Sequence, residues 1–150
     1  MKIFIDSNVF LFAYSSRNTN SSMVLANIDG DLLTPVVSYM VLDEVQARAK
    51  ELYGKDLAGL IRLNVITLPN IEIVSKERIK ALLSRYQSYV ADRDDLPHIC
   101  GYFAADCECF VTVNRRLTEM KIKELVCFKT PKEFVRDVLK LKPFDTSLGI

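Results

Sequence analysis

The alternation of short apolar runs with helix-forming segments is the feature that most constrains the fold of this chain. Apolar runs recur at residues 2–5, 32–37, 71–74, 110–113 and 125–128. Short apolar runs bounded by polar turn residues are typical of buried strands. Strands that are separated by helices form βαβ units, which assemble a mostly parallel sheet. We therefore predict an α/β domain with a mostly parallel, five-stranded sheet.

Capping residues and helical spacing indicate helices between these runs. Ser38 is a good N-cap for a helix that reaches residue 51 or 52, and Gly54 ends it. Ser7 or Asn8 is expected to cap the first helix. Pro35 cannot donate to a strand ladder, so its strand is expected to lie at a sheet edge or to begin there. Other helices are predicted at residues 9–14, 23–28, 56–63, 79–90 and 94–106, with a last one starting at Thr130-Pro131.

Length and composition favour one folded domain. The chain has 150 residues, of which 49% are hydrophobic and 26% are charged, which suits a single globular unit. We assign residues 1–140 to the domain and residues 141–150 to a C-terminal tail. No apolar run reaches the roughly 18 residues that span a membrane, and Asp6 interrupts the apolar start that a signal peptide needs. We expect a cytoplasmic protein with no membrane segment.

The chain has four thiols, Cys100, Cys107, Cys109 and Cys127. A chain of this size can build a core without disulfides, so we expect reduced, packed thiols. The Cys107-x-Cys109 spacing leaves a metal or redox role open, although no second pair or nearby histidine completes a zinc site.

Charge is distributed unevenly along the chain. The net charge is +1, but residues 115–150 hold nine Lys or Arg against five Asp or Glu. A basic end beside an acidic remainder suits the approach of a phosphate backbone to a metal site. The alternative is a solvated helix face whose lysine stems cover apolar surface.

Acidic and amide residues follow two of the predicted strands. In parallel sheets, ligands bind outside the carboxyl ends of the strands, which is where these residues lie. Asp6 follows the first run and Asn114 follows the fourth. Glu44 lies between apolar positions of a helix, and Asp95 opens the helix before the fourth strand. A charge at such a place needs a partner, and a metal ion would serve. Helix caps for Asp6 and Asp95, and exposure or a salt bridge for Glu44, are the alternatives.

Five segments, in chain order, resemble the motifs of PIN domains. They are residues 3–10 with Asp6, Ser38 with residues 41–45, residues 95–99, residues 110–117 and residues 130–134. Together they extend over about residues 1–139, and the ordered set is more specific than any one motif. The resemblance implies a three-layer α/β/α sandwich and a ribonuclease that uses Mg²⁺ or Mn²⁺. Many relatives are VapC-type toxins, so the implied partners are RNA, an antitoxin protein and a second copy in a homodimer.

The resemblance also implies the site residues. Asp6, Glu44 and Asp95 are the expected metal carboxylates, and Thr112 would orient them or contact the scissile phosphate. Asn114 stands at the fourth ligand position, where the family has an acid.

Four further residues are predicted to contact the substrate, and the only histidine is predicted to have a structural role. The expected contacts to RNA are Ser7, Asn8, Arg115 and Arg116. His98 lies one turn after Asp95, which places it within reach of the acids, and we interpret it as a packing or hydrogen-bonding residue.

The neutral side chain of Asn114 leaves other functions open. One unit charge at about 4 Å is worth on the order of 4 kcal/mol at an effective dielectric of 20, before desolvation offsets it. A PIN-like fold that binds RNA or a protein partner with weak or no catalysis is therefore the alternative to the ribonuclease. A phosphatase with Asp6 as nucleophile is a third hypothesis, but Asn8 stands where such enzymes carry a second aspartate.

Overall fold

One parallel sheet forms the centre of the protein. The computed structural model describes residues 1–119 and 121–150. Within them the strands are β1 Lys2–Ile5, β2 Thr34–Ser38, β3 Glu72–Val74, β4 Cys109–Val111 and β5 Phe128–Lys129. They form a five-stranded sheet in the order β3-β2-β1-β4-β5, and every neighbouring pair is parallel. The predicted parallel sheet is confirmed.

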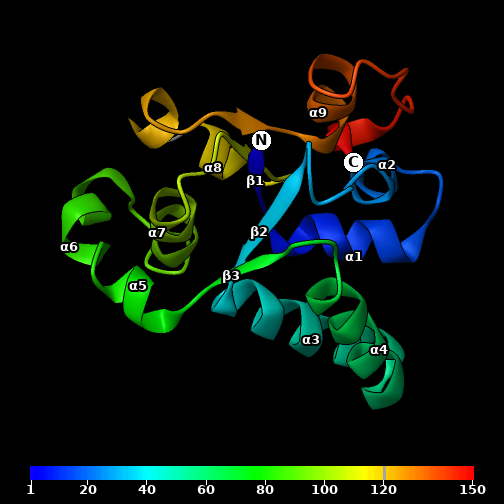
Figure 1. Ribbon diagram of the computed structural model, residues 1–150, viewed down its shortest axis with the longest axis horizontal. Coiled ribbons are helices and arrows are strands. Elements are labelled where there is room, and N and C mark those ends of the chain that lie inside the picture. The colour runs from blue at the N-terminus through cyan, green and yellow to red at the C-terminus, as the bar shows by residue number, and fades with distance from the viewer. Residues whose placement is uncertain (120) are drawn as a thin grey trace.

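Helices cover both faces of this sheet. The α-helices in the described residues are α1 Ser7–Ser15, α2 Asn20–Ala26, α3 Tyr39–Tyr53, α4 Lys55–Ile66, α5 Lys76–Lys80, α6 Leu83–Tyr86, α7 Leu96–Ala104, α8 Arg115–Thr118 and α9 Pro131–Asp137. Short 3-10 turns lie at Gln87–Tyr89, Lys121–Glu124 and Ser147–Gly149. Figure 1 shows α5, α6 and α7 on one side of the sheet and α1, α2 and α9 on the other, which is the predicted three-layer arrangement.

Local sequence explains where two of the helices begin. The Ser38 hydroxyl accepts the backbone N–H of Val41 at 3.1 Å, so α3 starts at the predicted cap, and Gly54 ends it. Thr130 and Glu133 form a reciprocal capping box at the start of α9. Both signals act within one helical turn, which is why the sequence alone identifies them.

Two predictions about element starts are corrected. Asp6, and not Ser7 or Asn8, is the N-cap of α1, because the chain turns directly at the end of β1. Pro35 lies on an interior strand, since β2 pairs with both β1 and β3, so the edge alternative is wrong. It is the second residue of β2 and precedes the first rung with β3, at Val36. Pairing with β3 therefore requires no hydrogen bond from the backbone nitrogen of Pro35.

The predicted helix at residues 79–90 is broken into shorter pieces. Helix α5 ends at Lys80, α6 follows after two residues, and a 3-10 turn continues the segment. Both short helices pack on α7. The ring of Tyr86 stacks on Phe103 of α7, with centroids 4.2 Å apart and planes 4° apart. Tertiary packing against α7 therefore overrides the regular helical spacing of the sequence.

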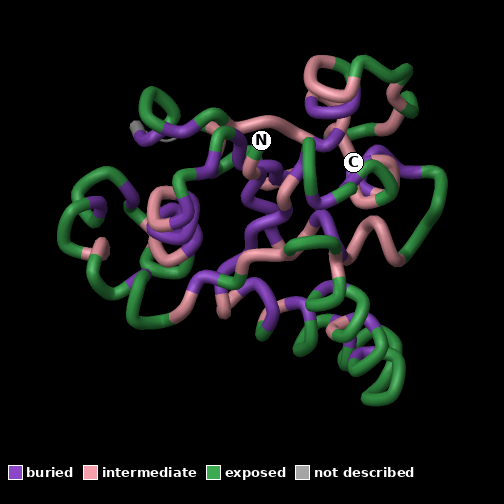
Figure 2. Tube along the Cα trace, viewed as in Figure 1, coloured by how far each residue is buried: buried purple, intermediate pink, exposed green. Residues whose placement is uncertain are grey.

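The apolar core follows the central strands and ends in polar residues. Figure 2 shows buried chain through the middle of the molecule and exposed chain at the outer helices. Phe4 of β1 and Phe110 of β4 are fully buried, with ring centroids 4.6 Å apart. Burial of one such side chain contributes about 1.5–3 kcal/mol. At the strand ends, Asp6 and Thr112 are only 5% and 0% exposed, so each needs a polar partner.

The C-terminal tail lies against α2. The side chain of Asn20, which is fully buried, accepts the N–H of Phe144 at 2.7 Å and donates to its carbonyl at 3.0 Å. The backbone N–H of Asn20 donates to the carbonyl of Ile150 at 2.9 Å. One buried amide therefore ties the tail to the rest of the chain.

The cysteines are free thiols. Cys100, Cys107 and Cys109 are buried as predicted, but Cys127 is exposed, so the prediction of a packed thiol is wrong for Cys127. Among the helices of the described residues, none combines the length and apolarity of a membrane span.

Candidate metal centre

The strand order brings two functional strand ends together. Strands β2 and β3 extend the sheet on one side of β1, whereas β4 and β5 extend it on the other. Ligands of open α/β sheets bind at such a switch point, outside the carboxyl ends of the strands. Asp6 follows β1 and Thr112 follows β4, so both lie at this point.

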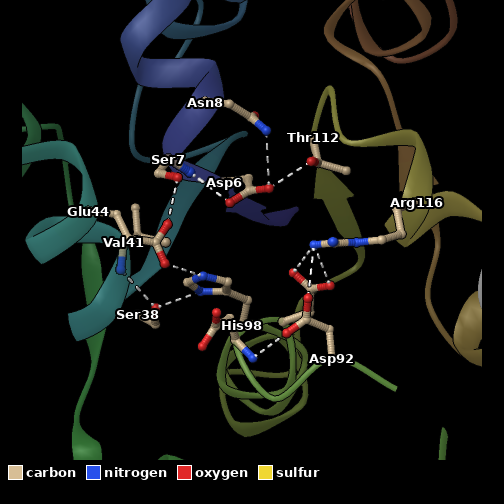
Figure 3. Close-up of polar contacts among 12 residues, drawn as sticks. Asp6, Ser7, Asn8, Ser38, Val41, Glu44, Asp92, His98, Thr112 and Arg116 are labelled. Carbon is tan, nitrogen blue, oxygen red and sulfur yellow. Dashed lines mark hydrogen bonds and ion pairs between the residues drawn. The ribbon is translucent and has the colours of Figure 1, made fainter. Parts of the chain in front are cut away.

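Asp6 is held in one orientation by donors from two elements. Its Oδ1 accepts the backbone N–H of Ser7 at 2.8 Å, and its Oδ2 accepts the hydroxyl of Thr112 at 2.7 Å (Figure 3). The side-chain amide of Asn8 donates to Oδ2 at 3.5 Å. The Thr112 hydroxyl in turn accepts the backbone N–H of Asn114 at 3.0 Å. Helix α1 and the end of β4 therefore fix this carboxylate together.

Glu44 reaches the same site from α3. Its Oε2 accepts the hydroxyl of Ser7 at 2.7 Å, and its Oε1 lies 2.8 Å from Nε2 of His98 (Figure 3). The other ring nitrogen of His98 lies 3.1 Å from the hydroxyl of Ser38. His98 is 4% exposed, so its ring is fixed on both sides inside the protein. The partner that Glu44 requires is therefore a histidine from α7.

Burial and pairing have opposite effects on the pKa values of Glu44 and His98. Burial raises the pKa of Glu44, but the hydrogen bond and charge of His98, with the hydroxyl of Ser7, outweigh it and leave that pKa lowered. Burial lowers the pKa of His98, but Glu44 and the nearby acids Asp6 and Asp95 leave that pKa raised. Both shifts favour an ionised Glu44–His98 pair.

Three side chains lie close enough together to hold one ion. Asp6, Glu44 and His98 each offer a ligand atom, and these atoms lie within 4.8 Å of one another. Carboxylate oxygens suit Mg²⁺ and Mn²⁺, and imidazole nitrogen suits transition metals. The donor set therefore fits a divalent cation, and two of its members are acids that the sequence predicts as ligands.

Asp95, the third predicted acid, lies outside this group of three. It occupies the N-cap of α7 and is 6% exposed. Nη2 of Arg116 lies 3.1 Å from its Oδ2 and 3.3 Å from Oδ2 of Asp92. Burial raises the pKa of Asp95; Arg116 lowers it, while Asp92 and Asp6 raise it, and the outcome is a raised pKa. The carboxylate is therefore paired with an arginine in this structure.

The remaining predicted residues have separate positions. The Asn114 side chain accepts the backbone N–H of Arg116 at 3.1 Å and so caps α8. Arg115 lines a cavity of about 720 Å³ between α8 and α9. Further basic side chains of this cavity are Lys123, Lys132 and Arg136. The two arginines predicted to contact RNA therefore face different surroundings.

The sequence did not identify His98 as a candidate ligand. Its contacts to Ser38 and Glu44 agree with the interpretation as a hydrogen-bonding residue. The available signal was its position one turn after Asp95 and its being the only histidine. Its approach to Asp6 and Glu44 depends on how α7 packs beside α3, which local sequence does not show.

Comparisons with known proteins support the fold. No family model and no curated protein matches the chain. A chain of VapBC2 from Rickettsia felis, solved with a promoter DNA fragment, has 16% identity and a TM-score of 0.62, with 87% of this chain and 98% of that chain covered. VapBC-1 from nontypeable Haemophilus influenzae has 12% identity and a TM-score of 0.65, and the match covers 87% of this chain and 98% of that chain.

A third solved structure matches over a shorter part of the chain. VapC20 from Mycobacterium tuberculosis, described as a sarcin-ricin loop cleaving toxin, has 17% identity and a TM-score of 0.51, with 72% of this chain and 86% of that chain covered. Identities this low establish a likeness of fold. The chain therefore shares the fold of these VapC structures, the PIN-like α/β fold that its ordered motifs predict.

Proposed function

We propose that this protein is a metal-dependent ribonuclease that cleaves RNA phosphodiester bonds as the toxin of a toxin–antitoxin pair. The observation that carries the proposal is the meeting of Asp6, Glu44 and His98 at the switch point of the sheet. The shared fold adds support, because one of the matched proteins is described as a toxin that cleaves the sarcin-ricin loop.

The residues of this chain would divide the work between metal binding and substrate positioning. Asp6 and Glu44 would hold Mg²⁺ or Mn²⁺, which when bound supplies a Lewis acid for the scissile phosphate. Thr112 holds Asp6, and Ser7 holds Glu44, so both carboxylates are oriented before a metal binds. Arg115, with the basic lining of its cavity, would hold the RNA backbone through phosphate contacts.

The proposed protein partner is an antitoxin. The matched Rickettsia, Klebsiella and Haemophilus structures are VapBC or toxin–antitoxin complexes, which supports such a partner for this chain. We further propose a homodimer that acts in the cytoplasm, where its RNA substrate is found.

Cleavage of mixed-sequence RNA in Mn²⁺, Mg²⁺ or EDTA tests the proposal. The decisive variant is Asp6→Asn, which keeps an oxygen for the N–H of Ser7 but removes the charge. Asp43→Asn is its matched control, because Asp43 is exposed on α3 directly before Glu44. We expect the control to cleave like the wild type. The Asp6→Asn variant should lose about a hundredfold or more in rate, since even outer partners of metal ligands are worth roughly 10–100-fold.

A second candidate function is an RNA- or protein-binding module with weak or no catalysis. It is favoured by the neutral Asn114 and by the pairing of Asp95 with Arg116, which together reduce the negative charge available to a metal. RNA binding without cleavage in any metal, unchanged by Asp6→Asn, would select this candidate over the ribonuclease.

A further inference from the structure

The spacing of His98 and Glu44 matches that of two ligands on one ion. Their nearest atoms, Nε2 and Oε1, lie 2.8 Å apart. Two ligands bonded at about 2.1 Å and at right angles lie about 3.0 Å from each other. Asp6 supplies the third ligand atom within 4.8 Å of both. One ion could therefore join the three with small shifts of their side chains.

The surroundings of His98 orient its Nε2 toward the acids. The Ser38 hydroxyl lies 3.1 Å from Nδ1, and the backbone N–H of Val41 donates to that hydroxyl. A polar partner on the second ring nitrogen is the usual way in which proteins aim a metal-binding histidine. The His98 ring also lies beside the ring of Phe4, with centroids 6.1 Å apart, and His98 is 4% exposed. The ring therefore presents Nε2 to Glu44 in a fixed orientation.

The other oxygen ligands expected at this site have different neighbours, although Oδ2 of Asp95 is buried and accepts no hydrogen bond. Asp95 is paired with Arg116 at 3.1 Å, and the side-chain oxygen of Asn114 caps α8. An arginine beside a carboxylate competes with a cation for its charge. The donors that remain together are therefore two carboxylates and one imidazole.

We propose that His98 coordinates the metal through Nε2, beside Asp6 and Glu44, with the ion displacing to solvent the proton that lies between Nε2 and Glu44, and that this mixed site takes a first-row transition ion such as Mn²⁺ in preference to Mg²⁺. The physical reason is that Mg²⁺ binds oxygen ligands and water in near-ideal octahedra, whereas imidazole nitrogen suits transition ions. The inference rests on the metal site of the proposed function, but it does not require that RNA be cleaved.

Isotope labelling tests this ligand without any mutation. His98 is the only histidine of the chain, so a protein without a histidine tag can be labelled with ¹⁵N at this one imidazole. Mn²⁺ is added to labelled and unlabelled protein, and electron spin echo envelope modulation is recorded. We expect ¹⁴N modulation of the bound Mn²⁺ that is replaced by the ¹⁵N pattern on labelling. Bound Mn²⁺ whose spectrum is unchanged by the label would overturn the inference.

Titration calorimetry of variants gives a second readout. In the wild type, Mn²⁺ should bind at least about tenfold more tightly than Mg²⁺. His98→Gln should weaken Mn²⁺ binding about tenfold and Mg²⁺ binding much less, on the roughly 10–100-fold scale of metal-site changes. Asp95→Asn, with Asp94→Asn as the exposed neighbouring control, should leave Mn²⁺ binding nearly unchanged. A larger loss in Asp95→Asn than in His98→Gln would contradict the assignment.

The two proposals fail in different ways. Mn²⁺ bound with nitrogen coupling but without cleavage supports His98 as ligand and contradicts the ribonuclease. Cleavage in Mn²⁺ without nitrogen coupling supports the ribonuclease and overturns the role of His98. Absence of both Mn²⁺ and Mg²⁺ binding to folded wild-type protein, with folding checked by thermal unfolding, overturns both.

Discussion

The guanidinium of Arg116 lies 3.1 Å from the carboxylate of Asp95, so this predicted metal ligand is paired with a cationic side chain of the protein itself. The same guanidinium nitrogen lies 3.3 Å from Asp92 (Figure 3), which makes it a bridge between two acids. The two residues come from different elements, α8 and the cap of α7. Asp95 is not a member of the group formed by Asp6, Glu44 and His98, and its nearest cation is Arg116.

Removal of this arginine should change the metal preference. In Arg116→Gln, Asp95 and Asp92 lose their cation, and their charge becomes available to a hard ion. We expect Mg²⁺ affinity to rise about tenfold, or about 1.4 kcal/mol, by titration calorimetry. The melting temperature should fall, because the Asp95 carboxylate, whose side chain is only 9% exposed, loses its cation. Arg115→Gln is the matched control, and an unchanged Mg²⁺ affinity in Arg116→Gln would contradict this account.

The buried hydroxyl of Thr112 should matter for stability and for the metal. Thr112→Val removes the donor to Asp6 and the acceptor of the Asn114 N–H while keeping the shape of the side chain. Oδ2 of Asp6 then keeps only the 3.5 Å contact with the Asn8 amide, and the partly buried N–H of Asn114 loses its acceptor, at a total cost of about 1–3 kcal/mol. Chemical unfolding should show this loss, and Mn²⁺ affinity should fall. Thr112→Ser keeps the hydroxyl, so a Ser variant as poor at binding Mn²⁺ as the Val variant would exclude the hydrogen bond as the cause.

Restoring a charge at position 114 tests whether the neutral amide limits the site. In Asn114→Asp the carboxylate can still accept the N–H of Arg116 and cap α8, so the local fold should be kept. We expect Mn²⁺ affinity to rise by about tenfold, since even part of a Coulomb energy of about 4 kcal/mol suffices. Asn64→Asp adds the same charge at an exposed position of α4. If neither affinity nor cleavage differs from this control, position 114 does not limit the protein.

The thiols should differ sharply in reactivity, and their burial should make stability depend on pH. Burial raises the pKa of Cys107 and of Cys109 to about 12, and that of Cys100 to about 11. At pH 8 a thiol reagent should therefore modify the exposed Cys127 quickly and the other three only after denaturation. Rapid modification of any thiol in folded Cys127→Ser would contradict the packed arrangement.

The sign of the pH effect follows from these raised pKa values. The unfolded thiols ionise near pH 8.5, whereas the folded ones stay protonated to much higher pH. Their contribution to stability is complete below about pH 8.5 and is lost as the pH rises toward 12. The free energy of unfolding, measured in urea, should therefore fall between about pH 8.5 and pH 11. A flat profile over that range would show that the thiols are not buried.

Local signals account for the parts of the site that the sequence predicted. Asp6 follows an apolar strand, and Ser38 caps α3 through the N–H of Val41, so both positions depend on residues a few places apart. The parallel sheet follows from the alternation of strands and helices along the chain. These features were predictable because strand burial and helix capping act over one or two turns of backbone.

The sequence by itself determined the α/β class, the starts of α3 and α9, and the positions of Asp6 and Glu44. Only the tertiary structure decided which partners those acids meet. His98 reaches Glu44 across 54 positions of sequence, and Arg116 reaches Asp95 across 21. Such contacts depend on how α7 and α8 pack around the sheet, and packing is set by the whole core at once. Local sequence does not encode this packing. Helical spacing tells which residues share a face of a helix, but not which neighbours that face meets.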